Sequence, residues 1–98
     1  MSYDILDGIY LKKNEEGYTL FMLLRVSNVY GEDGKRAKTL WCEDIYTKED
    51  EKRIIEGVRQ SFEDGTIKGG KIRTFNSFLK QYEAQKELIV MAIKNGAW

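Results

Sequence analysis

The chain has 98 residues, enough for one hydrophobic core, and we expect residues 1–98 to form a single domain. Its 16 Lys and Arg residues balance its 16 Asp and Glu residues, so it lacks the positive excess typical of proteins that bind duplex nucleic acid. It contains no histidine and one cysteine, which removes the usual general base, the commonest metal ligand and any intramolecular disulfide.

The first half of the chain predicts three antiparallel strands joined by short turns. A strand over residues 9–13 leads into a polar turn over 14–17, whose closing glycine we expect at positive φ. Tyr18–Tyr30 is rich in β-branched and aromatic residues and is apolar on both faces, which is typical of a central strand. After a glycine-containing turn over 31–34, the alternation over 35–46 predicts the third strand.

The second half predicts two helices. Thr47 is a suitable N-cap for a helix over residues 48–63, whose apolar residues recur at helical spacing. Thr74 is a suitable N-cap for the last helix. Leu88–Met91 is an unbroken apolar run, so we expect the C-terminal half of this helix to be buried more deeply than its first half.

Residues 66–73 read nearly as a palindrome about two glycines, and this pattern predicts a β-hairpin with a Gly-Gly turn. In that register Ile67 and Ile72 both point toward the body of the domain. The predicted fold class is therefore α+β: a three-stranded antiparallel β-meander, then a helix, a short β-hairpin and a C-terminal helix, with the helices packed on one face of the sheet.

No constellation of residues predicts catalysis. Cys42 has no histidine to activate it, so we interpret it as a buried structural residue. Glu43 and Asp44 are neighbours on a strand and point to opposite faces. We therefore expect a protein that is not an enzyme, with no catalytic residue, no metal site and no small-molecule cofactor.

Aromatic side chains and an arginine form the first candidate surface. We expect Tyr10, Phe21, Arg25 and Trp41 on the sheet face turned away from the helices. Such residues stack nucleic-acid bases or anchor protein interfaces. Leu23 lies on the same face and favours a protein partner. The alternative is that the last helix or the N-terminus covers this face as part of the core.

The second candidate surface is the tip of the predicted hairpin, where positive charge is concentrated. Lys68, Lys71 and Arg73 surround two glycines whose backbone amides could approach an anion. Contact with phosphate or with an acidic partner is one interpretation, and a solvated turn is the other.

These observations favour a small, non-enzymatic, intracellular protein-binding domain of adaptor or inhibitor type, such as phages and mobile elements carry. It would act through the apolar and aromatic sheet face, alone or as a homodimer. The alternative is nucleic-acid binding through the basic hairpin 66–73 and the sheet aromatics. The N-terminus lacks an apolar secretory segment, and no apolar run is long enough to span a membrane, so we expect a cytoplasmic location. The candidate binding residues are Phe21, Leu23, Arg25, Trp41, Lys68, Lys71 and Arg73.

Overall fold

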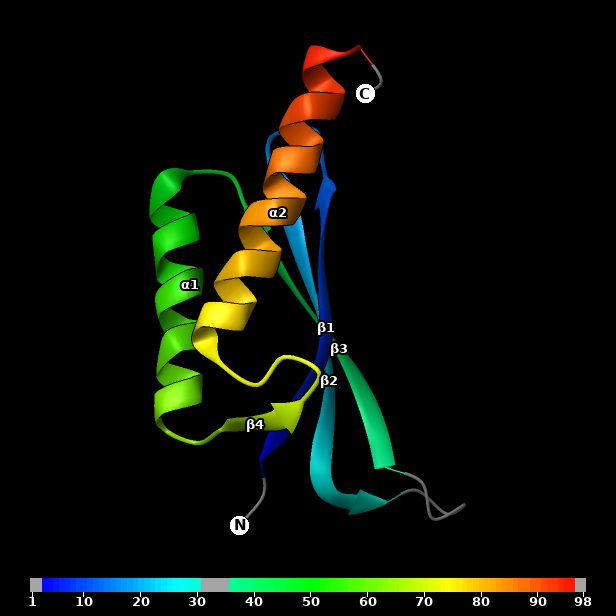
Figure 1. Cartoon of the computed structure of the whole chain (residues 1–98), viewed down its shortest axis with the longest axis vertical. Helices are drawn as coiled ribbons and strands as arrows, with labels where there is room; N and C mark the ends of the chain where they lie inside the picture. The colour runs from blue at the N-terminus through cyan, green and yellow to red at the C-terminus, as the bar shows by residue number, and fades with distance from the viewer. Residues whose placement is uncertain (1–2, 31–35, 97–98) are drawn as a thin grey trace.

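A computed structural model describes residues 3–30 and 36–96 of the chain (Figure 1). They form four strands and two helices. In chain order these elements are β1 (Asp4–Lys13), β2 (Tyr18–Tyr30), β3 (Arg36–Ile45), α1 (Lys48–Glu63), β4 (Ile67–Gly70) and α2 (Phe75–Lys94).

The four strands form one mixed sheet in the order β3-β2-β1-β4. β2 pairs antiparallel with both β1 and β3, so the predicted meander and the internal position of β2 are confirmed. β4 pairs with β1 in the parallel direction, which makes the sheet mixed rather than purely antiparallel. The turn predicted over 31–34 lies outside the described residues.

The predicted hairpin over 66–73 is wrong, because only one strand, β4, forms there. β1 begins at Asp4, earlier than the sequence suggested, and β4 pairs with the start of β1, at Asp4 and Leu6, instead of with the residues that follow it. A short isolated hairpin is at best marginally stable. Beyond β4 the chain stays beside β1, where the backbone amide of Ile72 donates to the carbonyl of Leu6 at 3.2 Å. Ile67 and Ile72 are both buried in the core, as expected.

Gly17 closes the first turn for a different reason from the one predicted. Its φ is not positive, since the described glycines with positive φ are other residues. A Cβ atom at Gly17 would lie 2.1 Å from the carbonyl oxygen of Ile45. The turn is instead fixed by Asn14, whose side-chain oxygen accepts from the amides of Glu16 at 3.1 Å and Gly17 at 2.6 Å. Close approach between backbones therefore requires glycine here.

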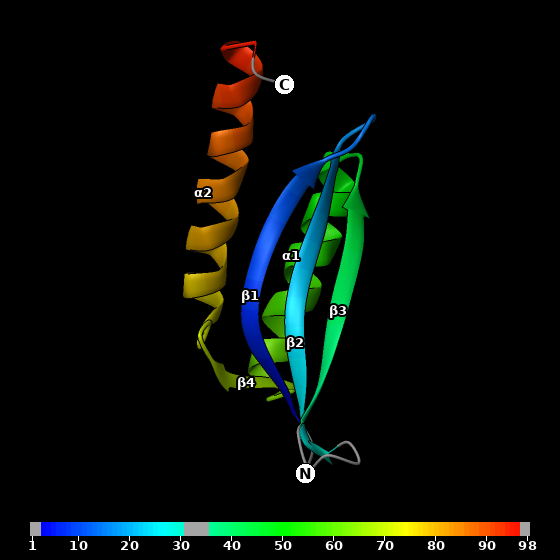
Figure 2. The same cartoon turned by 90° about the vertical axis from the view of Figure 1, so that its right-hand side faces the viewer.

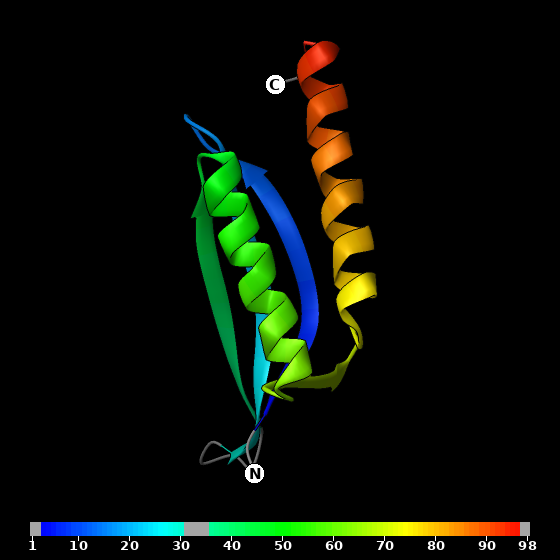
Figure 3. The ribbon, with the colours of Figure 1, turned by 90° about the vertical axis from the view of Figure 1, so that its left-hand side faces the viewer.

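Both helices lie on the same side of the sheet, with α1 over β2 and β3 and α2 beside β1 (Figures 1 and 3). α1 begins and ends at the predicted residues. Its N-terminus is a capping box, in which Thr47 and Asp50 each accept a hydrogen bond from the other's backbone amide. The core between sheet and helices includes Leu6, Leu20, Phe78 and Tyr82, all fully buried.

The expectation that the C-terminal half of α2 is the more deeply buried half is wrong. Phe78 and Tyr82 in the first half are completely buried, whereas Leu88 and Met91 are 65% and 51% exposed. A 20-residue helix is about 30 Å long, and α2 extends past the end of the sheet (Figure 2). Its last turns therefore have no sheet beneath them.

Candidate functional site

The sheet face opposite the helices carries the first candidate surface, which we call the outer face. It is formed by alternate residues of the three long strands, and Figure 2 shows it toward the viewer, with α1 behind it and α2 to one side. In the strand register, Tyr10 pairs with Phe21 and Phe21 with Cys42, while Leu23 pairs with Leu40. No helix of the described residues covers this face.

The middle of the outer face is apolar and open to solvent, and a polar row of Lys12, Thr19 and Asp44 crosses it at one end. The rings of Tyr10 and Phe21 stack with their centroids 4.6 Å apart and their planes 6° from parallel. Tyr10 is 48% exposed and Leu40 is 51% exposed. Cys42 is also exposed, which corrects the expectation that it is buried, because neither helix covers this side of β3. The result is an aromatic and aliphatic patch of the kind that mediates protein contacts.

At one end of the outer face, the positive charge of Arg25 is neutralised by Asp7. The register of β1 against β2 shifts between Leu6 and Gly8, so Asp7 is the extra residue of a bulge. The guanidinium of Arg25 donates from Nε to Asp7 Oδ2 at 2.6 Å and from Nη2 to Oδ1 at 3.1 Å. This hydrogen bonding raises the pKa of Arg25 above its ordinary value. The sequence pattern gave no sign of the bulge, and so Asp7 was missed.

Trp41 does not lie on the outer face, contrary to expectation. It pairs with Met22, whose side chain is in the core, so Trp41 points to the helix side of the sheet. There it lines a groove of about 390 Å³ between α1 and the sheet, together with Ile54 and Val58. Its ring is 49% exposed, and its Nε1 donates to Glu43 Oε1 at 3.0 Å.

The basic residues lie apart from both of these surfaces. Lys68, Lys71 and Arg73 are all exposed around β4, at the edge of the sheet opposite β3. The ammonium of Lys68 lies 5.8 Å from the ring centroid of Tyr3, and Arg73 Nε donates to the carbonyl of Gly70 at 3.4 Å. The seven candidate residues thus fall into three places: the outer face, the groove at β3 and the edge at β4.

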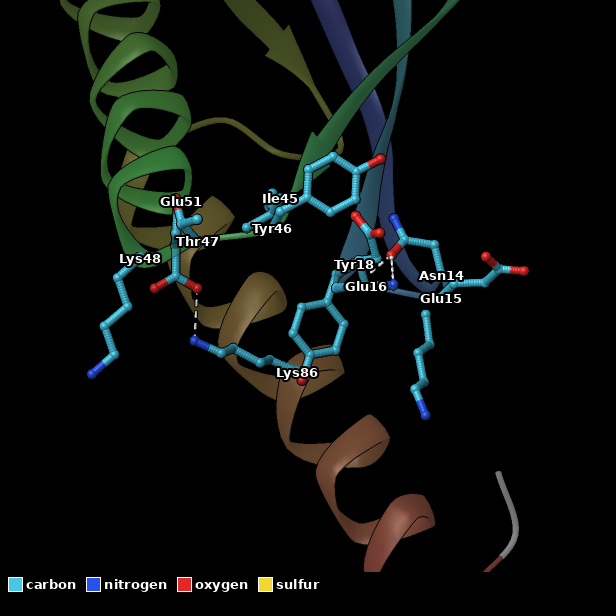
Figure 4. Close-up of a pocket in the computed structure, with 12 residues that line it drawn as sticks. Asn14, Glu15, Glu16, Tyr18, Ile45, Tyr46, Thr47, Lys48, Glu51 and Lys86 are labelled. Atoms are coloured by element: carbon cyan, nitrogen blue, oxygen red, sulfur yellow. Dashed lines mark hydrogen bonds and ion pairs between the residues drawn. The ribbon is translucent and has the colours of Figure 1, made fainter.

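A second cleft, of about 380 Å³, lies between the first turn, the end of β3 and the two helices (Figure 4). Three lysines and three glutamates are among the residues that line it. At its base Glu51 of α1 accepts hydrogen bonds from two residues of α2, from the hydroxyl of Tyr82 at 2.7 Å and from the ammonium of Lys86 at 2.6 Å. This cluster joins the two helices.

The titration of this cluster favours a structural role. Burial works to raise the pKa of Glu51, but the hydrogen bonds from Lys86 and Tyr82 outweigh it and lower that pKa. The bond to Glu51 raises the pKa of Lys86, and burial raises that of Tyr82 well above its ordinary value. The carboxylate stays charged, the amine protonated and the phenol neutral near pH 7. None of the three is poised as a general acid, base or nucleophile.

Among residues 3–30 and 36–96, no group of three or more acidic or cysteine side chains could hold a metal ion. No helix in the described part of the chain is long and apolar enough to cross a membrane. Comparison with protein-family models, with curated proteins and with solved structures finds no match to this chain.

Proposed function

We propose that this chain is a small, non-enzymatic protein-binding domain of adaptor or inhibitor type, and that its contact surface is the outer face of the sheet. One observation carries the proposal. The stacked Tyr10 and Phe21 lie with Leu23 and Leu40 on a sheet face that neither helix covers. Soluble domains rarely leave such a patch exposed unless it binds something.

The chemistry of the outer face indicates the kind of partner. Tyrosine and phenylalanine supply large apolar area at low conformational cost, and they are common anchors of protein interfaces. Arg25 is paired with Asp7, so its charge is neutralised within the domain. A partner with a complementary apolar surface fits better than a strongly charged one.

Binding of nucleic acid remains the alternative proposal, and it makes a different demand. It needs free cations beside the stacking aromatics. Of the described lysines, exposed Lys12 shares the outer face with Tyr10. Lys68 and Lys71 lie around β4, which pairs with Asp4 and Leu6, further along β1 from the stacked Tyr10. This separation supports the protein-binding proposal over the nucleic-acid one.

The test is affinity capture from a lysate of the source organism, quantified by mass spectrometry, with wild type, Tyr10→Glu and Leu88→Glu in parallel. Tyr10 and Leu88 are both exposed apolar residues, but Leu88 lies on α2, away from the outer face. We expect Tyr10→Glu to lower the amount of each protein that wild type retains by at least roughly tenfold, which is the loss that removing a single interface anchor causes. Leu88→Glu should retain the same proteins in the same amounts as wild type.

Two results would contradict the proposal. One is equal retention by wild type and Tyr10→Glu, provided that circular dichroism shows both folded. The other is capture that disappears after nuclease treatment or falls steeply as salt rises, which is the behaviour of phosphate contacts and would support nucleic-acid binding.

A further inference from the structure

We infer that two copies of this chain associate through the outer edge of β3, pairing antiparallel about a two-fold axis at Trp41, so that their sheets become one. This contact uses the edge of the sheet rather than its outer face. The inference is therefore independent of the proposed function, and the two can fail separately.

The rest of the chain covers one long edge of the antiparallel meander, at β1, and leaves the other, at β3, open. On the β1 side, β4 pairs with Asp4 and Leu6. Further along, the side chain of Gln85 on α2 continues the ladder. Its Nε2 donates to the carbonyl of Ile9 at 2.6 Å, and its Oε1 accepts from the amide of Leu11. This edge is closed along most of its length, as expected of a protein that avoids open strand edges.

The β3 edge has no such cover. No strand pairs with its outer side, and none of the hydrogen bonds of residues 3–30 and 36–96 reaches it. β3 is ten residues long, and Thr39, Leu40, Trp41 and Cys42 are consecutive exposed residues along it. Figure 2 shows it as a free border of the sheet. A long, partly apolar edge with unpaired backbone groups is a template for another strand.

The sequence of β3 is complementary to itself in one register. With the axis at Trp41, Leu40 lies opposite Cys42 of the second copy on the outer face, and Thr39 lies opposite Glu43 on the helix side. Each contact occurs twice, as a two-fold interface requires. An axis at Cys42 would instead place Leu40 against Asp44 and Trp41 against Glu43. Of these two registers, the one with its axis at Trp41 matches apolar with apolar and polar with polar residues.

The groove beside β3 supports the same arrangement. An axis perpendicular to the sheet puts the helices of both copies on one side, so the two 390 Å³ grooves open toward each other. Trp41 is half exposed and lines its groove together with Ile54 and Val58. In the paired sheet the two Trp41 rings meet at the axis and cover one another. Tryptophan is among the residues most enriched at such centres.

Cys42 allows the register to be tested directly. Directly opposite residues on paired strands have Cβ atoms about 4.5–5.5 Å apart, close to what a disulfide needs, whereas diagonal residues are too distant. Leu40→Cys places a thiol opposite Cys42 of the second copy. Asp44→Cys is the matched control, because it is exposed on the same face at the same spacing from Cys42. We expect mild oxidation to yield covalent dimers from Leu40→Cys and not from Asp44→Cys.

The mass in solution provides the second measurement. By light scattering after size exclusion, wild type and Tyr10→Glu should both have twice the mass of one chain at micromolar concentrations. Trp41→Lys, which puts two like charges at the axis, and Thr39→Glu, which faces Glu43 of the second copy, should both have the mass of a monomer. Two variants are used so that misfolding of one, seen by circular dichroism, leaves the other as the test. A monomeric wild type, or equal cross-linking of Leu40→Cys and Asp44→Cys, would overturn the inference.

Discussion

Gly70 lies at the end of β4 in a space that no larger residue fits. Its φ is +78°, and a Cβ atom there would lie 2.6 Å from Ile5 Cγ2 and from the carbonyl oxygen of Leu6. Its neighbour Gly69 has a similar φ of +70° but open space around it. The pair therefore separates two reasons for which a chain needs glycine, namely backbone conformation and close packing.

Alanine substitutions at the two glycines should differ in cost. Gly69→Ala incurs only the cost of placing alanine in a left-handed backbone conformation, and it should lower the free energy of unfolding by about 1–2 kcal/mol. Gly70→Ala should lose a further 1–3 kcal/mol, roughly the cost of forcing extra atoms into packed space. Urea denaturation of both variants measures the difference. Equal losses would mean that β4 does not press against β1 as described.

At the scale of whole elements, the sequence predicts features that depend on neighbouring residues, but not the pairing of strands that are distant in the chain. The boundaries of α1 follow from Thr47 and from apolar spacing within sixteen residues, so they could be predicted. The segment containing β4 satisfied a local hairpin pattern, but its partner is β1, at the other end of the chain. No window of the sequence contains both.

The positions of some candidate site residues could likewise be predicted from the sequence, and those of others could not. Alternation within β2 put Phe21, Leu23 and Arg25 on one face, and the structure agrees. The face of Trp41 depends on how β3 aligns with β2, and a shift of one residue reverses it. That alignment, like the bulge at Asp7, is set by contacts between strands rather than within them.

The uneven burial of α2 predicts an uneven response to truncation along this helix. Phe78→Ala removes a fully buried ring and should cost about 3–5 kcal/mol in the free energy of unfolding. Leu88→Ala removes an exposed side chain and should change it by less than about 0.5 kcal/mol. Thermal and urea unfolding of both variants provide the comparison. A large loss with Leu88→Ala would show that the end of α2 is covered in solution.

At the scale of the molecule, the two helices pack against different parts of one sheet, and hydrogen bonds to Glu51 link them. Figure 3 shows α1 over the sheet and α2 beside it, next to β1. The carboxylate of Glu51 accepts from both Tyr82 and Lys86, so one charged group of α1 holds two positions of α2. Its ionisation therefore connects the docking of α2 to pH.

The stability of the domain should depend on this carboxylate in a defined pH range. The pKa of Glu51 is lowered from its ordinary value of 4.5, so its contribution is complete above that value and is lost as pH falls through the folded-state pKa. The difference in unfolding free energy between wild type and Glu51→Gln should be constant from about pH 5.5 to 7 and shrink below about pH 4.5.

Denaturant titrations at a series of pH values measure that difference. Glu87→Gln is the control, since Glu87 is an exposed glutamate on α2, the helix that Glu51 contacts. It should leave the pH profile of wild type unchanged. A gap between wild type and Glu51→Gln that stays constant down to pH 3 would contradict the assignment.

The parallel pairing of β1 with β4 also imposes an order on synthesis. β1 leaves the ribosome first, yet the strand that completes its side emerges only after β2, β3 and α1 have been made. Until Gln85 and Ile72 have followed, the nascent chain carries β1 with that flank bare. Such late, distant closure slows folding and prolongs the interval in which a growing chain can associate wrongly with its neighbours.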